Sequence, residues 1–173
     1  MKKIALAVAT LGLVMMTGSS FAANSLNAGT FGLNIPLITT TATTNTNIQS
    51  PLISGKYFLA KDMAVLGGFG FSSGGASGAS STTFALMGGM RKYLKVDDFA
   101  PFIGGFLGYE TTSSNPSSSA TTLTAEGGAE YFLAKQFSIE GKVGLGFRSV
   151  KRAAVKSTFF GTSTATLSVN YYF

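Results

Sequence analysis

Hydrophobic and polar residues alternate along much of the chain with a period of two. In the clearest case, Phe137 to Phe147, an apolar face of Phe, Ile, Val and Leu alternates with a polar face that carries Glu140 and Lys142. Successive side chains of a β-strand point to opposite faces, so this pattern predicts a strand. A strand with one oily and one polar face suits the wall of a barrel that meets lipid on its outside.

The same pattern recurs in other parts of the chain. Eight segments are predicted as strands: 27–37, 51–59, 63–72, 81–94, 99–109, 121–133, 137–148 and 159–173. Most match or modestly exceed the roughly 9–11 residues of a tilted membrane strand. The first is the least regular, because Pro36 cannot donate to a ladder. The facing of strand 99–109 stays open, since bulky apolar residues occupy both parities between Phe102 and Leu107.

The predicted connections alternate between short and long. Residues 60–62, 95–98 and 134–136 form tight charged turns, whereas 38–50, 73–80, 110–120 and 149–158 are long and rich in Ser, Thr, Gly and Asn. This alternation predicts an all-β fold, an eight-stranded antiparallel transmembrane β-barrel with up-and-down meander topology. Backbone groups in lipid must all be bonded, so strand 27–37 should close the ring against strand 159–173. The alternative, a soluble β-sandwich, would carry more surface charge.

The first 22 residues differ from the rest. Lys2 and Lys3 precede an apolar run, and Ser20 and Ala22 supply the small residues of a cleavage site. We therefore predict a signal peptide over 1–22 and an outer-membrane β-barrel domain over 23–173. The alternative, an N-terminal membrane anchor, is disfavoured by the short length of the run and by its flanks.

Composition narrows the possible chemistry. Charged residues make up 12% of the chain, about half the usual share of a soluble protein. Cysteine and histidine are absent, which removes disulfides, the usual catalytic base and the commonest metal ligand. Glycine-rich stretches at 67–70 and 144–146 lie inside predicted strands and are not followed by a helix, so they predict no nucleotide site. We expect no enzyme activity, no cofactor, no metal and no nucleic-acid partner.

Charged residues on the inward faces form the main candidate site. By parity, six of them should point into the same lumen: Lys56, Arg91, Glu126, Glu130, Glu140 and Lys142. Lys142 should lie diagonal to Glu126 and Glu130, and Lys56 and Arg91, about four residues from their own short turns, should lie at a similar height. Paired carboxylates can serve as general acid and base. A structural network is the favoured interpretation, because three acids and three bases balance and buried charges are normally paired. Glu130 should face Glu140 across the ladder.

Basic residues also gather in one long connection. Lys151, Arg152 and Lys156 lie in segment 149–158. Cationic side chains there could pair with lipopolysaccharide phosphates. The alternative is an ordinary solvated loop, where single exposed charges contribute little.

Aromatic residues collect near both ends of the predicted strands, as expected for two interfacial belts. The expected belt near the short turns is Tyr57, Tyr93, Phe99, Tyr131, Phe137, Tyr171 and Phe173. The expected belt near the long connections is Phe69, Phe71, Phe84, Tyr109, Phe147 and Phe159.

The end of the sequence adds a resemblance. Val169, Tyr171 and Phe173 alternate toward a terminal aromatic, which resembles the assembly signal of outer-membrane barrels. The stretches 101–109 and 127–132 resemble the fifth and sixth strands of the small eight-stranded barrels, a superfamily that includes outer membrane protein X, opacity-type and outer membrane protein A-like domains. The resemblance implies an outer-membrane location with long loops outside and both termini periplasmic. It also implies contact with lipid, lipopolysaccharide and the barrel-assembly machinery.

Together these features predict a structural or surface-interaction barrel whose loops contact lipopolysaccharide, an external ligand or a host surface. The alternative is a narrow porin or small-solute channel. An eight-stranded barrel has an interior that side chains just fill, which ranks the channel second. A lipid-modifying enzyme ranks third, for want of histidine.

Overall fold

A computed structural model describes residues 26–39, 53–76, 79–162 and 165–173. The predicted signal peptide, 1–22, lies outside these residues, as does most of connection 38–50. These described residues form nine strands: β1 (Phe31–Thr39), β2 (Ile53–Ala60), β3 (Met63–Ala76), β4 (Ala79–Tyr93), β5 (Phe99–Ser113), β6 (Ser118–Ala134), β7 (Phe137–Arg152), β8 (Val155–Thr162) and β9 (Thr166–Tyr172). Within the described ranges, no helix has the length and apolarity needed to cross a membrane.

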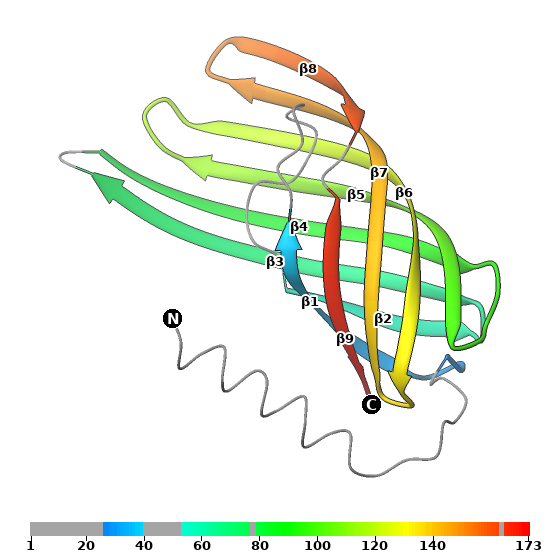
Figure 1. Ribbon diagram of the computed structural model, residues 1–173. Helices are drawn as coiled ribbons and strands as arrows, with labels where there is room; N and C mark the ends of the chain where they lie inside the picture. Colours follow the sequence, from blue (N-terminus) through cyan, green and yellow to red (C-terminus); the bar gives the residue numbers. More distant parts are fainter. Residues whose placement is uncertain (1–25, 40–52, 77–78, 163–164) are drawn as a thin grey trace.

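Eight of the nine strands close into a ring (Figure 1). Strands β1 to β7 pair antiparallel in sequence order, and β9 joins β7 to β1. The seam between β1 and β9 pairs Gly32 with Tyr172 and Asn34 with Asn170. The predicted eight-stranded up-and-down barrel and the pairing of its first and last strands are therefore confirmed.

Pro36 is accommodated by an irregularity in the first strand. The register between β1 and β9 shifts between Pro36 and Ile38, so Leu37 is an extra residue on the β1 side. A bulge absorbs the interruption that a proline makes in a ladder. Ile35 and Ile38, on either side of the bulge, pair with Val169 and Leu167 and remain on the outer face.

The predicted last strand, 159–173, is wrong in its bounds. It consists of two strands, because residues 155–162 fold back on β7 and only residues 166–172 complete the ring. β7 pairs with β9 as far as Lys142 and with β8 from Leu145 onward. The predicted loop 149–158 is thus a two-stranded hairpin that turns between Arg152 and Val155. A strand that outlasts its ring neighbour still needs ladder partners, and the hairpin supplies them.

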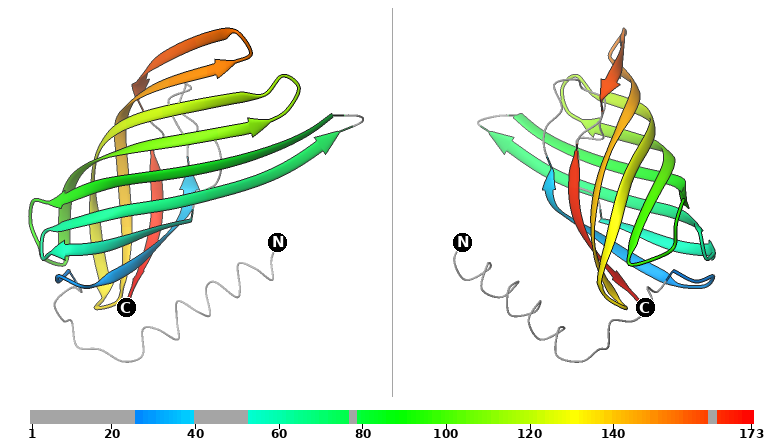
Figure 2. Two further views of the ribbon diagram at one scale, coloured as in Figure 1. Left: turned by 180° about the vertical axis from the view of Figure 1, so that it is seen from behind. Right: turned by 45° about the vertical axis from the view of Figure 1, so that its right-hand side comes forward.

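Two further predicted loops are also largely strand. β3 and β4 together occupy all of 73–80 except two residues outside the description, and β5 and β6 leave only 114–117 between them. Their many Ser and Thr residues favour a loop prediction, which is wrong here. In the structure some of them form hydroxyl pairs with a neighbouring strand, as Thr112 of the second predicted loop does with Thr83 at 2.9 Å. These extensions carry the strands well beyond the closed part of the ring on one side (Figure 2).

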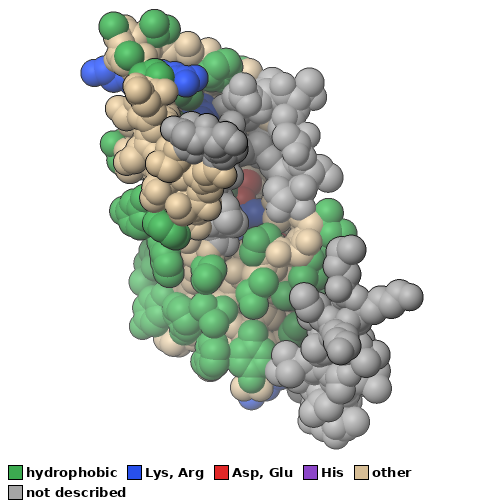
Figure 3. All heavy atoms as spheres, turned by 90° about the vertical axis from the view of Figure 1, so that its left-hand side faces the viewer, with side chains coloured by type: hydrophobic (Ala, Val, Ile, Leu, Met, Phe, Trp, Pro, Cys, Tyr) green, Lys and Arg blue, Asp and Glu red, His purple; other side chains and the backbone are tan. Residues whose placement is uncertain are grey.

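The two faces of the wall separate by parity. On strand 99–109, whose facing the sequence left open, Ile103 and Leu107 are 54% and 58% exposed on the outside, whereas Phe102 is buried in the lumen. On the face drawn in Figure 3, hydrophobic side chains cover the lower part of the outer wall, and other side chains and backbone predominate above it. Two predicted belt residues belong inside: Tyr93 is buried, and Phe159 pairs with the inward Arg148. Proximity to a strand end identifies an interfacial aromatic only when parity agrees.

Candidate functional site: a charged lumen beneath an open rim

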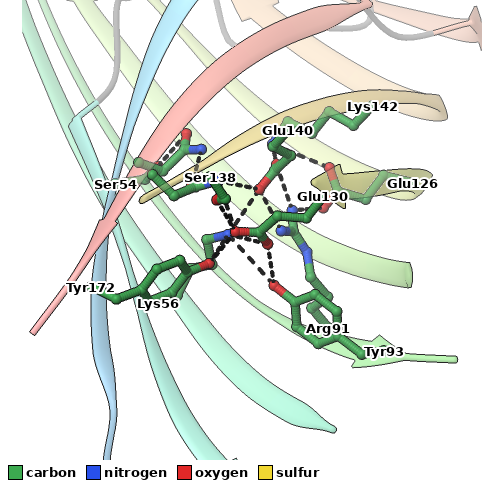
Figure 4. Close-up of polar contacts among 12 residues, drawn as sticks. Ser54, Lys56, Arg91, Tyr93, Glu126, Glu130, Ser138, Glu140, Lys142 and Tyr172 are labelled. Carbon is green, nitrogen blue, oxygen red and sulfur yellow. Dashed lines mark hydrogen bonds and ion pairs between the residues drawn. The ribbon is translucent and has the colours of Figure 1, made fainter. Parts of the chain in front are cut away.

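The lumen contains a polar network contributed by strands from all around the ring (Figure 4). The structure brings together the six charged residues singled out from the sequence: Lys56, Arg91, Glu126, Glu130, Glu140 and Lys142. Glu130 and Glu140 are direct cross-strand partners in the β6–β7 ladder. Like charges in that position repel each other, so the cations between them determine whether the arrangement holds.

Lys56 is the central cation. Its Nζ lies 3.0 Å from Glu130 Oε2 and 2.8 Å from Glu140 Oε2, so it bridges the two carboxylates that face each other. The same ammonium donates to the hydroxyl of Tyr172 at 2.9 Å. Lys56 and both carboxylates are buried. A buried ammonium is tolerated when its donors are all engaged, as they are here.

Glu130 is the most heavily coordinated anion. Tyr93 donates to its Oε2 at 2.8 Å, and Asn170 donates to its Oε1 at 3.0 Å. Ser138 and Tyr172 also donate to Oε1. With Lys56, five side chains from four strands converge on one carboxylate. Such a group is held in place by the fold and is poorly placed to accept a proton from a substrate.

Arg91 and Lys142 complete the charge balance. Arg91 donates to Glu126 at 2.7 Å and through two nitrogens to Glu140 at 2.8 and 3.0 Å. Its guanidinium carbon stacks 3.7 Å from the centre of the Phe102 ring. Lys142 lies 3.3 Å from Glu126 and, at 16% side-chain exposure, is the least buried cation of the network. It contacts Glu126 and Glu140, and the cation beside Glu130 is Lys56.

Aromatic side chains fill the lumen at the short-turn end of the network. Phe58 stacks on Tyr93 at 5.6 Å and meets Tyr172 edge-on at 6.0 Å, and Phe132 stacks on Tyr172 at 5.5 Å. Phe102 packs against Tyr93 at 5.8 Å. Two of the five rings, Tyr93 and Tyr172, point their hydroxyls at Glu130, so the aromatic cluster and the ionic network form one unit.

Sequence reasoning missed several neutral members of this unit. Ser138 and Asn170 lie on the polar faces of β7 and β9, and both are buried against Glu130. Asn170 also accepts from Asn34 across the seam at 2.7 Å. Their inward parity was visible in the alternation. Their height in the lumen was not, because it depends on the stagger between strands.

A second ion pair lies higher in the lumen. Arg148 Nη2 donates to Glu110 Oε1 at 2.7 Å, and both side chains are buried. The inward parity of Arg148 could be read from β7. Glu110 was missed because it was assigned to a long loop, whereas it lies within β5.

The three basic residues of segment 149–158 are divided between two faces of the hairpin. Lys151 and Lys156 are direct register partners on the outer face, and the Ser149–Thr158 pair lies between them and the Phe147–Phe160 pair. Arg152 has the opposite parity and lies on the inner side, opposite Val155. All three are exposed. The cluster predicted from the sequence is therefore two separate features.

The short turns carry exposed ion pairs of a different kind. Lys92 bonds the Asp62 carboxylate, and Lys95 lies 2.9 Å from Asp97. Each ammonium lowers the pKa of its partner carboxyl below the usual range, mainly through the hydrogen bond. Exposed pairs like these contribute little to stability.

The six charged residues of the network and the five aromatic rings beneath it form a structural plug in the lumen. Each carboxylate of the network is engaged by at least two cationic or hydroxyl donors. Within the described part of the chain, no three acidic side chains are arranged to hold a metal ion.

Comparisons with known proteins show the fold. No protein-family profile and no curated protein matches the sequence. Among solved structures, the outer membrane protein OprG of Pseudomonas aeruginosa is similar over 88% of this chain and 99% of its own, with 14% identity and a TM-score of 0.53. The N-terminal β-barrel domain of OprF from the same organism is similar over 84% and 98%, with 11% identity and a TM-score of 0.51. The chain thus has the fold of the small outer-membrane β-barrels.

Proposed function

We propose that this protein is an integral outer-membrane barrel with a closed lumen, and that it acts through its outer surface. The observation that carries the proposal is the plug. Aromatic rings and a balanced network of three cations and three carboxylates occupy the lumen where a solute would have to pass. A barrel sealed in this way has its wall and rim left for function.

The outer wall fits a bilayer. Its outward side chains are mainly Leu, Ile, Val, Phe and Tyr, and exposed aromatics lie toward both ends of the strands, including Phe71, Tyr109, Phe99 and Tyr131. This distribution is typical of a lipid-facing band between two interfaces. We propose the orientation usual for outer-membrane barrels, in which the short turns are periplasmic. The C-terminal end then also faces the periplasm, and the strand extensions with the β7–β8 hairpin face the outside.

Lys151 and Lys156 are proposed to bind lipopolysaccharide. They lie side by side on the outward face, beyond the exposed aromatics Phe147 and Phe160. Adjacent ammonium groups repel each other, and an anion between them removes that cost. In the outer leaflet the nearest anions at this height are lipopolysaccharide phosphates, which can accept charge-assisted hydrogen bonds from both lysines.

The test compares two matched double variants of the refolded protein. Lys151→Met/Lys156→Met removes two charges from the hairpin, and Lys61→Met/Lys135→Met removes two from the short turns. Binding to lipopolysaccharide in nanodiscs should weaken by about tenfold or more in the first, as expected for losing charge-assisted bonds. The second should bind as wild type. Equal binding by both variants would remove the hairpin lysines from the proposal.

Conductance separates the proposed surface role from the porin alternative. Wild-type protein in a planar bilayer should show no long-lived open state, because the plug is bonded on every side. Steady ion conductance by wild type would refute the closed lumen, without bearing on the lysine contacts.

The alternating residues Val169, Tyr171 and Phe173 are proposed to serve the assembly machinery. Tyr171 and Phe173 contact each other at 5.0 Å, and Phe173 stacks on Phe31 at 6.1 Å beside the seam. Phe173→Ala should lower the yield of inserted protein in cells and leave refolding into detergent intact. An unchanged cellular yield would argue against a signal at this position.

A further inference from the structure

Above the Glu110–Arg148 pair, the extended strands enclose a hollow of about 530 Å³, called the vestibule below. Strands β3 to β8 all contribute to its wall, on the side where they outrun the closed ring (Figure 2). Seven of its thirteen lining residues are Ser or Thr. Its size is within the range of small-molecule sites, about 300–1,000 Å³. The plug lies deeper, so this hollow is a feature separate from the network.

The hydroxyls of the hollow are aligned by register. Ser72 pairs with Thr83, Thr83 with Thr112, Thr112 with Ser118, and Ser118 with Arg152, so one row crosses five strands and ends at a guanidinium. Each hydroxyl can both donate and accept. The row therefore offers closely spaced groups that match the neighbouring hydroxyls of a sugar ring.

The floor and one side of the hollow complete this chemistry. Glu110 and Arg148, joined at 2.7 Å, place a carboxylate acceptor and guanidinium donors at the base. A second hollow of about 470 Å³ adjoins the first and shares Val150, Arg152 and Phe159 with it, and it is lined mainly by apolar atoms. A sugar ring has hydroxyls around its edge and apolar C–H groups on its faces, so it needs both kinds of wall.

We infer that this vestibule binds an acidic saccharide residue, with its hydroxyls on the Ser/Thr row, a C–H face toward Phe159 and its acid group at Arg152. Arg152 lines both hollows and has no acidic partner within salt-bridge distance among the residues the structure describes. Two guanidiniums against one carboxylate leave the vestibule with a positive excess. The inference rests on the proposed outward orientation of the rim.

The test titrates refolded protein in phospholipid nanodiscs with trigalacturonate, and with maltotriose as the neutral trisaccharide of similar size. Wild type should prefer the acidic sugar by about tenfold, as expected for one charge-assisted bond. Arg152→Gln should abolish that preference. Lys151→Gln removes the same charge from the adjacent residue on the outer face and should keep it. Thr83→Val/Thr112→Val should weaken both sugars.

Two outcomes would overturn the inference. Either wild type binds neither sugar, or Arg152→Gln and Lys151→Gln reduce the preference equally, as a general charge effect would. Because Lys151 and Lys156 are left intact in Arg152→Gln, lipopolysaccharide binding through the hairpin can fail or succeed independently. Repeating the titration in nanodiscs that contain lipopolysaccharide identifies the source. Competition that depends on Arg152 points to lipopolysaccharide sugars, and its absence points to a soluble glycan; both results support the site.

Discussion

Two levels of the lumen carry ion pairs, and they are built differently. The lower level joins six charges with Tyr, Ser and Asn donors, on a floor of aromatic rings. The upper level contains the ion pair of Glu110 and Arg148, beneath a hollow lined by hydroxyls. The first is enclosed on all sides, whereas the second adjoins space that a ligand or water can enter. Charge inside this barrel therefore closes the lumen where donors and aromatic rings fill the space, and leaves it accessible where an ion pair borders a hollow.

We expect the largest loss of stability from a substitution in the lower level. Lys56→Met removes the cation between Glu130 and Glu140, two buried carboxylates that face each other. The free energy of unfolding should fall by about 3–5 kcal/mol, as is usual when one partner of a buried pair is lost. Urea unfolding in detergent measures it. Lys151→Met, on the exposed hairpin, is the control and should change stability by no more than about 0.5 kcal/mol. Loss below 1 kcal/mol in Lys56→Met would mean that water replaces the ammonium.

A double-mutant cycle in the lower level measures the coupling between Lys56 and Glu130. Glu130→Gln combined with Lys56→Met leaves two cations and two carboxylates in the network, so charge balance returns. The double variant should recover about 1–3 kcal/mol of the loss in Lys56→Met, the range for residues in one network. Strict additivity of the two changes would show that Lys56 and Glu130 are not coupled.

Removing the Arg148 cation of the upper level should cost less stability than removing Lys56. Arg148→Met removes one cationic partner of Glu110, and that carboxylate adjoins the vestibule and can be solvated there. We expect a loss of about 1–2 kcal/mol, below that of Lys56→Met. Both variants are compared by the same unfolding measurement. A loss as large as that of Lys56→Met would place the upper pair in an equally closed environment.

The smallest expected effect concerns the hairpin that borders the vestibule. Ala153, in the β7–β8 turn, has a φ of 51°, a left-handed conformation that costs alanine about 1–2 kcal/mol. Ala153→Gly relieves this strain but gives the unfolded chain more freedom, so the net gain should be about 0.5 kcal/mol. Amide exchange of β8 should slow, while exchange in the closed ring stays unchanged. Faster exchange in β8 would show that the turn is not strained.

The ring itself could be predicted because its signal is local and repeated. Alternation identified the walls, and closure followed from the need to bond every backbone group in lipid. The six charges were found by the same parity, which is why Lys56 and Glu130 could be placed inside without coordinates. Their pairing could not be predicted, since it depends on stagger between distant strands.

The rim was mispredicted because composition was given more weight than pairing. Ser- and Thr-rich stretches were assigned to loops, although Thr is a good strand residue once a partner strand lies beside it. Because Glu110 lies in a segment predicted as a loop, its inward position was not predicted, and neither was the vestibule that it lines. The folding back of β8 depends on where β9 begins, and alternation alone carries no information on that.

Formation of the seam between β1 and β9 should also limit the rate at which the barrel folds. The Asn34–Asn170 bond spans 136 residues, and the bonds from Lys56 to Glu130 and Glu140 span 74 and 84. Contacts so distant in the chain form slowly, because the entropy of closing a long loop must be met first, whereas β7 and β8 meet across a turn of two residues. We expect the hairpins to form early and the plug and the seam to form together in the slow step. The interactions that block the lumen are then the ones that a closed barrel must break to open again.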